Sequence, residues 1–110
     1  MKWFSNPGIP ASVMEARIMK ILKKLKIIYF REVSFRNFLS PRGYPYRYDF
    51  YFPDRNLIIE YDGSHHIETR VKKNDNIKNK YCKKKKIKLI RLNKKNFKTL
   101  EKDLKKIFNG

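Results

Sequence analysis

The sequence has almost none of the residues that build disulfides or metal–thiolate sites. Cys82 is its one cysteine, which excludes an intramolecular disulfide and any cysteine-rich zinc module. Apolar runs are also short: stretches such as 27–30 fall far below the roughly 20 residues that a membrane-spanning helix needs. Residues 1–8 lack the apolar stretch of a secretory signal peptide. We therefore expect a cytoplasmic protein that makes no membrane contact.

Acidic residues are scarce as well. The chain has 110 residues, with 10 Asp and Glu against 28 Lys and Arg, and a formal net charge of +18. Such a charge attracts polyanions, and nucleic acid is the leading candidate. Residues 71–110 hold 16 basic and 3 acidic residues, so we expect most nucleic-acid contacts there. The expected contact residues are Lys83, Lys84, Lys85 and Lys86, together with Arg47. The alternative is that this charge run is an ordinary solvated helix face.

The apolar residues are numerous enough to form a core. They make up 41% of the chain, and its length suits one domain over 1–110. Their spacing predicts helices over 12–26, 70–85 and 97–107, and strands over 27–35, 46–52, 57–62 and 87–92. The last strand is almost continuously apolar, which is typical of a central buried strand. The order helix-strand-strand-strand-helix-strand-helix predicts a mixed α/β fold, with a central mixed sheet of about four strands flanked by helices.

Two of the scarce acidic residues are expected to face each other across the hairpin of 46–52 and 57–62. A turn centred on 54–55 gives three opposite pairs: Phe52 with Leu57, Phe50 with Ile59, and Asp49 with Glu60. Opposite Cβ atoms lie about 4.5–5.5 Å apart, so the two carboxylates repel each other unless a cation lies between them. Oxygen ligands favour Mg²⁺, with Mn²⁺ as the alternative ion. Two other arrangements stay open: a bulge would turn Asp49 to the other face, or both acids pair with arginines such as Arg47.

The residues of this hairpin resemble a known family. Residues 47–53 (RYDFYFP) and 57–66 (LIIEYDGSHH) look like the core of the PD-(D/E)XK nuclease superfamily. They are most similar to the branch with the very-short-patch repair endonucleases and the phage homing endonucleases named for an E-D-x-H-D pattern. The resemblance runs from Glu15 to Leu92, and it implies a restriction-endonuclease-like core and a metal-dependent endonuclease that hydrolyses phosphodiester bonds in DNA, with RNA left open. The implied catalytic residues are Glu15, Asp49, Glu60, His66 and Asp75, with Asp49 and Glu60 as the metal ligands.

The chain departs from the superfamily pattern at three positions. Two residues after the second acid, where the pattern has a lysine that positions or activates the attacking water, this chain has Asp62. The related branch places a histidine nearby instead, so the resemblance implies that His66 does this work; an imidazole with an ordinary pKa near 6.5 can exchange protons close to neutral pH. Two smaller departures are Tyr48 in place of a proline and His65 in place of a glutamine.

Ordinary structural roles remain open for several of these residues. Glu15 completes a capping box with Ser12, and Asp75 has the spacing of a helix ion pair with Lys78. His66 has the alternative of an ordinary loop histidine. The alternative function is a non-catalytic, basic nucleic-acid-binding protein that keeps the nuclease fold. The chain has no separate recognition motif, so a homing-type role in a phage or mobile element would require a homodimer or a partner that supplies specificity; repair is the other role considered.

Overall fold

A computed structural model describes residues 2–10, 12–62 and 69–109 of the chain. These residues form a mixed α/β fold, which confirms the predicted fold class. The elements in chain order are β1 (Trp3–Ser5), α1 (Val13–Lys24), β2 (Phe30–Phe35), β3 (Tyr48–Phe52), the 3₁₀ turn η1 (Pro53–Arg55), β4 (Leu57–Asp62), α2 (Thr69–Lys85), β5 (Lys88–Asn93), the 3₁₀ turn η2 (Lys94–Asn96) and α3 (Leu100–Asn109). Every expected helix and strand is present; the strand 57–62 has the predicted bounds, and the ends of the others are shifted. The sequence analysis missed β1, because three residues are too few to show an alternating pattern.

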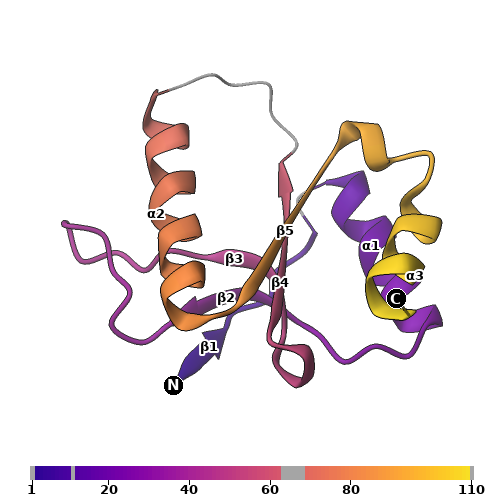
Figure 1. Cartoon of the computed structure of the whole chain (residues 1–110), viewed down its shortest axis with the longest axis horizontal. Helices are drawn as coiled ribbons and strands as arrows, with labels where there is room; N and C mark the ends of the chain where they lie inside the picture. The colour runs from indigo at the N-terminus through magenta and orange to yellow at the C-terminus, as the bar shows by residue number, and fades with distance from the viewer. Residues whose placement is uncertain (1, 11, 63–68, 110) are drawn as a thin grey trace.

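The five strands form one sheet in the order β1-β2-β3-β4-β5. The pairs β1–β2, β2–β3 and β3–β4 are antiparallel, and β5 runs parallel to β4, with α2 as the crossover between them (Figure 1). The prediction that residues 87–92 form a central strand was therefore wrong, since β5 lies at the edge of the described sheet. Its apolar character has another cause: Leu92 packs into the core on one face of the sheet and Leu89 against the core on the other.

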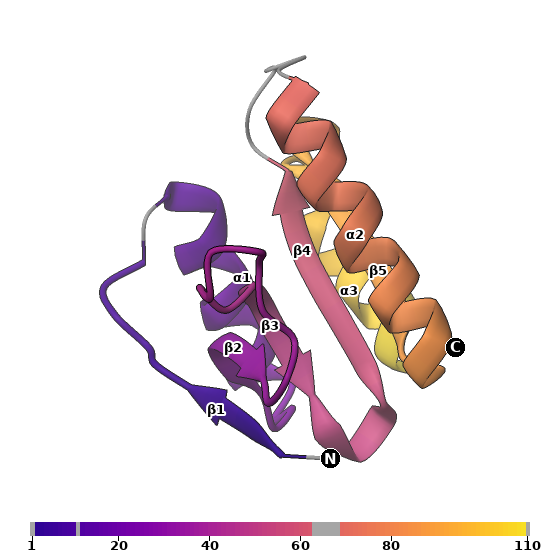
Figure 2. The ribbon, with the colours of Figure 1, turned by 90° about the vertical axis from the view of Figure 1, so that its left-hand side faces the viewer.

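Helices cover both faces of the sheet and create two apolar clusters. Figures 1 and 2 show α1 and α3 on one face and α2 on the other. On the first face, Ile18 and Leu104 pack against Phe50 and Ile59 of the sheet. The second face is more aromatic, and there Cys82 of α2 lies among side chains that include Phe35, Tyr48 and Tyr51. Phe50 and Tyr48 are two residues apart on one strand yet face opposite sides, so β3 does not alternate regularly around Asp49.

The β3–β4 hairpin has the register that the sequence predicts over its described pairs. Phe52 lies opposite Leu57, and Phe50 opposite Ile59. The connection is η1 followed by Asn56, which adopts a left-handed conformation (φ 50°) and donates a side-chain hydrogen bond to the carbonyl oxygen of Lys86 (2.7 Å). Asparagine tolerates this backbone region better than most residues. The turn therefore fixes the register that carries Asp49 and Glu60 to the far end of the hairpin.

Candidate active site

Glu15 reaches the site from the first turn of α1. The helix begins at Val13 because the hydroxyl of Ser12 accepts a hydrogen bond from the Glu15 N–H (3.1 Å), which satisfies one of the unpaired amides at the helix start. The same hydroxyl lies 3.4 Å from Oε2 of Glu15. Only 9% of Glu15 is exposed. The cap predicted from the sequence is confirmed, and it fixes a buried carboxylate at the end of the sheet.

Three carboxylates from three different elements meet at this end of the sheet. Glu15 of α1, Glu32 of β2 and Asp49 of β3 each offer an oxygen, and these oxygens all lie within 4.8 Å of one another. Glu32 adopts a left-handed conformation (φ 52°), and the Cα pairs between β2 and β3 skip this residue. The sequence analysis missed Glu32. A signal was available, because Glu32 is the one acidic residue between Glu15 and Asp49 in a chain poor in acids.

Asp49 and Glu60 are linked through the backbone of each other's strand. The Asp49 N–H donates to Oε2 of Glu60 (2.9 Å), and the Tyr61 N–H donates to Oδ2 of Asp49 (2.7 Å). Burial, and next the negative charge of Glu60, raise the pKa of Asp49 from its ordinary 3.8 to about 8. The two acids are therefore adjacent, although the described Cα pairs of the hairpin end at Phe50 and Ile59. Glu60 itself is not among the three residues of the carboxylate cluster.

Lys78 of α2 forms an ion pair with Glu60, and the sequence analysis missed this role. Its Nζ contacts Oε1 of Glu60, and the two side chains are only 15% and 6% exposed. The aromatic ring of Tyr48 lies 4.9 Å from the ammonium, and the Tyr48 hydroxyl donates to the Lys78 carbonyl oxygen (3.0 Å). The alternative in which Glu60 pairs with an arginine such as Arg47 does not hold, because Glu60 pairs with Lys78 and Arg47 pairs with Glu32. Lys78 thus places a cation beside Glu60. The superfamily pattern has its lysine at the position where this chain has Asp62.

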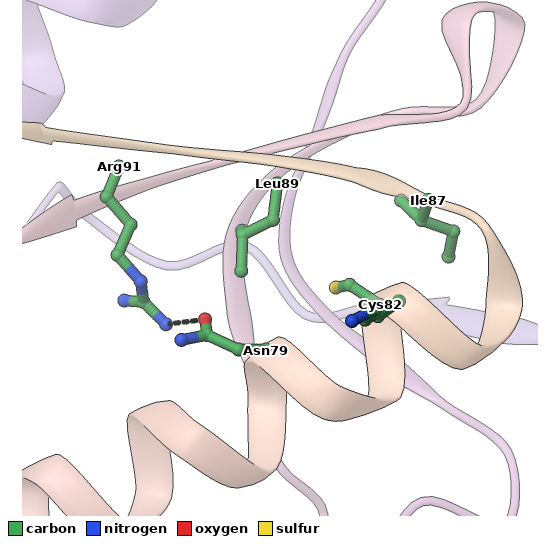
Figure 3. Close-up of a pocket in the computed structure, with 6 residues that line it drawn as sticks. Asn79, Cys82, Ile87, Leu89 and Arg91 are labelled. Atoms are coloured by element: carbon green, nitrogen blue, oxygen red, sulfur yellow. Dashed lines mark hydrogen bonds between the residues drawn. The ribbon is translucent and has the colours of Figure 1, made fainter.

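Asp75 lies within α2 and pairs with β5 rather than with Lys78. Its Oδ1 is 3.4 Å from NH1 of Arg91, and Arg91 also donates to Oδ1 of Asn79 (2.9 Å). Figure 3 shows this hydrogen bond at one end of an open hollow of about 550 Å³ between α2 and β5. Cys82 lines the same hollow, and burial raises the pKa of its thiol, which argues against a nucleophilic role.

The other predicted site residues are more dispersed. His66 lies outside the described residues. Arg47 is exposed and forms a long ion pair with Glu32 of the carboxylate cluster (3.9 Å). The predicted contact lysines, Lys83, Lys84, Lys85 and Lys86, are exposed at the end of α2 and just beyond it. Lys84 and Lys85 line a second hollow together with Arg36 and Lys2.

Comparisons with known proteins bear on the family and the fold. The family described as "Protein of unknown function (DUF2726)" matches residues 53–108. No curated protein matches the chain. Among solved structures, the chain is similar to the catalytic domain of the homing endonuclease I-Bth0305I, with a TM-score of 0.61 and 21% identity over 88% of this chain and 91% of that one. This similarity shows a nuclease-like fold. Among the described helices, none is long and apolar enough to cross a membrane.

Proposed function

Because the chain belongs to the DUF2726 family, whose description names no activity, we propose a function from its own site: a metal-dependent nuclease that hydrolyses phosphodiester bonds in DNA. The observation that carries this proposal is the cluster of Glu15, Glu32 and Asp49, in which carboxylate oxygens from three elements lie within 4.8 Å of one another. Its setting supports the proposal, since the fold is similar to that of a homing endonuclease catalytic domain and the net charge is +18.

The carboxylate cluster fits a hard divalent cation. Carboxylate oxygens are the ligands that Mg²⁺ and Mn²⁺ prefer in proteins. The raised pKa of Asp49 indicates that burial and its acidic neighbours disfavour its charge, and a cation between the acids relieves that repulsion. When bound, such an ion supplies positive charge to the phosphate oxygens and increases the acidity of water. We assign Glu15, Glu32 and Asp49 as its ligands, with Glu60 as a further ligand from the hairpin.

The remaining residues have three roles: they position the acidic side chains, bind the DNA strand and transfer a proton. Lys78 holds Glu60 against the Asp49 N–H and lowers the net negative charge of the acidic group. Exposed lysines bind the phosphates of the substrate. We assign His66 as the acid–base residue, and Asp75 as a positioning residue that holds Arg91. Within this proposal the chain falls in the PD-(D/E)XK superfamily, near the very-short-patch repair and E-D-x-H-D homing endonucleases, and acts in the cytoplasm.

The proposal is tested by cleavage of plasmid and single-stranded DNA with Mg²⁺, with Mn²⁺ and with EDTA. We expect cleavage only with a metal ion, and its loss in Glu15→Gln, Glu32→Gln and Asp49→Asn. Glu101→Gln is the matched control, because Glu101 is an acid on α3 outside the cluster. An Asp49→Asn variant that cuts as fast as the parent protein would refute the metal site. DNA binding with no cleavage under any condition would favour the non-catalytic alternative.

His66 has a separate test. His66→Ala should lower the single-turnover rate by roughly 10²–10⁴, the usual contribution of a positioned acid–base group. Metal affinity should change much less, since His66 is not assigned as a ligand. His65→Ala serves as the neighbouring control. Equal effects of the two substitutions, or loss of metal instead of rate, would contradict the role assigned to His66.

A further inference from the structure

A hollow of about 560 Å³ lies beside the carboxylate cluster. Its walls come from the start of α1, the end of β4 and the segment 94–98, and they include Val13, Tyr61 and Phe97 with Lys94, Lys95 and Lys98. We call it the Phe97 hollow. The Tyr61 N–H donates to Oδ2 of Asp49 (2.7 Å), so one wall of the hollow is bonded directly to the acidic site. A DNA strand held at the carboxylate cluster could therefore extend into the Phe97 hollow.

The Phe97 hollow offers an exposed apolar surface that the fold does not use for its core. Val13 is 72% exposed and Phe97 is 41% exposed. The guanidinium of Arg17 lies over the Phe97 ring, 4.5 Å from its centroid, and donates to the Phe97 carbonyl oxygen (3.3 Å). An aromatic ring that remains partly accessible is suited to stacking against another flat apolar group.

The lysines of the Phe97 hollow lie on a preformed turn. The side chain of Asn93 accepts from the Lys95 N–H (2.8 Å), and the side chain of Asn96 accepts from the Asn93 N–H (2.9 Å). Asn96 in turn donates to Asp103 of α3 (3.0 Å). Lys95 and Lys98 are exposed, and within the described part of the chain neither forms an ion pair with a carboxylate. The turn thus places Lys95 and Lys98, neither of which forms an ion pair within the described residues, beside the aromatic ring.

We propose that the Phe97 hollow binds one unpaired nucleotide of the strand that is cleaved, with its base on Phe97 and Val13 and its phosphate on Lys95 and Lys98. The proposal rests on the proposed nuclease function. Cations with an accessible aromatic ring are the combination that binds single strands, since each base has a face that stacks and each phosphate a charge. A base inside a duplex is already stacked and cannot reach this surface. The preferred substrate is therefore single-stranded or locally unpaired DNA.

The test is binding in EDTA, where no cleavage occurs, measured by fluorescence anisotropy with labelled oligo(dT) and with a blunt hairpin duplex. Phe97→Ala should weaken oligo(dT) binding roughly 5- to 160-fold, the range expected for loss of one base–aromatic stack. The affinity for the duplex should stay unchanged. Phe97→Trp should keep the oligo(dT) affinity. Phe4→Ala is the matched control, because Phe4 is a 58% exposed aromatic residue on β1.

The outcomes separate this proposal from the nuclease function. If Phe97→Ala binds oligo(dT) as tightly as the parent protein, the nucleotide site is refuted whether or not the protein cuts DNA. An equal loss for oligo(dT) and duplex would also overturn it, because the contact would not require an unpaired base. If the parent protein fails to cut under every metal condition but Phe97→Ala still loses oligo(dT) binding selectively, the nucleotide site stands and the nuclease function fails.

Discussion

Glu60 is an acid that the protein can bury because Lys78 lies against it. Both side chains are largely withdrawn from water, and Oε2 of Glu60 also accepts from the Asp49 N–H. Lys78→Gln removes the cation and leaves Glu60 buried beside another acid. We expect a loss of roughly 3–5 kcal/mol in the free energy of unfolding, as for other broken buried pairs, measured by urea denaturation at pH 8.

The matched control for this substitution is Lys105→Gln. Lys105 pairs with Glu101 on the surface of α3, where both side chains are well exposed. Exposed pairs contribute little to stability, so this variant should unfold close to the parent protein. If the two lysine variants lose the same stability, the Lys78–Glu60 pair is not a buried pair in solution.

Asp49 makes the stability of the apoprotein depend on pH. Its pKa is raised to about 8 by burial and by Glu60, above the ordinary 3.8 expected for the unfolded chain. The charged form is therefore unfavourable in the native state, and stability from this group is lost as the pH rises from about 4 through about 8. Asp49→Asn removes that loss and keeps an oxygen for the Tyr61 N–H. The melting temperature of Asp49→Asn should therefore exceed that of the parent protein, and the difference should grow as the pH rises through this range.

The control for the pH effect is Asp54→Asn, since Asp54 is exposed in the hairpin turn. Its melting temperature should follow the parent protein from pH 4 to pH 9. Added Mg²⁺ or Mn²⁺ should stabilise the parent more at pH 8 than at pH 5, because a cation binds the deprotonated acids. A difference between Asp49→Asn and the parent that does not vary with pH would contradict the assigned cause.

The residues of the site differ in how far the sequence could reveal them. Asp49 and Glu60 could be predicted from the sequence, because a hairpin with a short turn fixes which residues approach each other. For Glu32 the scarcity of acids was the one signal, and its positive φ angle within a strand is a feature that sequence patterns do not show. Lys78 was missed because its pairing with Glu60 depends on how α2 docks on the sheet. The geometry of a hairpin depends on residues that are close in the sequence, whereas the packing of α2 on the sheet depends on residues that are far apart in it.

At the scale of elements, the cap of α1 controls the position of Glu15. Ser12→Ala removes the hydroxyl that accepts from the Glu15 N–H. We expect a loss of about 0.5–2 kcal/mol in the free energy of unfolding by urea. Ser12→Asn should recover most of it, because asparagine is an equally good capping residue. If Ser12→Asn is as unstable as Ser12→Ala, the stabilising interaction is the one between the hydroxyl and the Glu15 carboxylate rather than the cap.

The arrangement of elements was predictable only where neighbours in sequence are neighbours in space. The β3–β4 hairpin followed from its turn residues and its two apolar runs. The place of β5 did not, because a strand reached through a crossover helix can add at the centre or at the edge of a sheet. A continuous apolar run indicates cover on both faces, which β5 obtains from α2 and α3, and it does not reveal how many strands flank it.

At the scale of the whole molecule, exposed lysines lie on several elements. The net charge of +18 alone would attract DNA. The question is whether the end of α2 makes specific contacts with phosphates or only adds to the overall potential. Lys83, Lys84 and Lys85 are exposed in the last turn of α2. Lys20, Lys23 and Lys26, on α1 and just beyond it, form a second group of lysines at the opposite face of the sheet.

Two triple variants with the same reduction in charge separate these cases. Replacing Lys83, Lys84 and Lys85 by glutamine should make the slope of log affinity for duplex DNA against log salt concentration shallower by about 0.9 for each phosphate that is no longer neutralised. Replacing Lys20, Lys23 and Lys26 should leave the slope close to that of the parent, because those lysines would contribute only long-range potential, which salt screens. The measurement is a titration of labelled duplex at several salt concentrations in EDTA. Equal slopes for the two variants would mean that binding follows net charge alone, and the predicted contact surface at Lys83–Lys86 would be wrong.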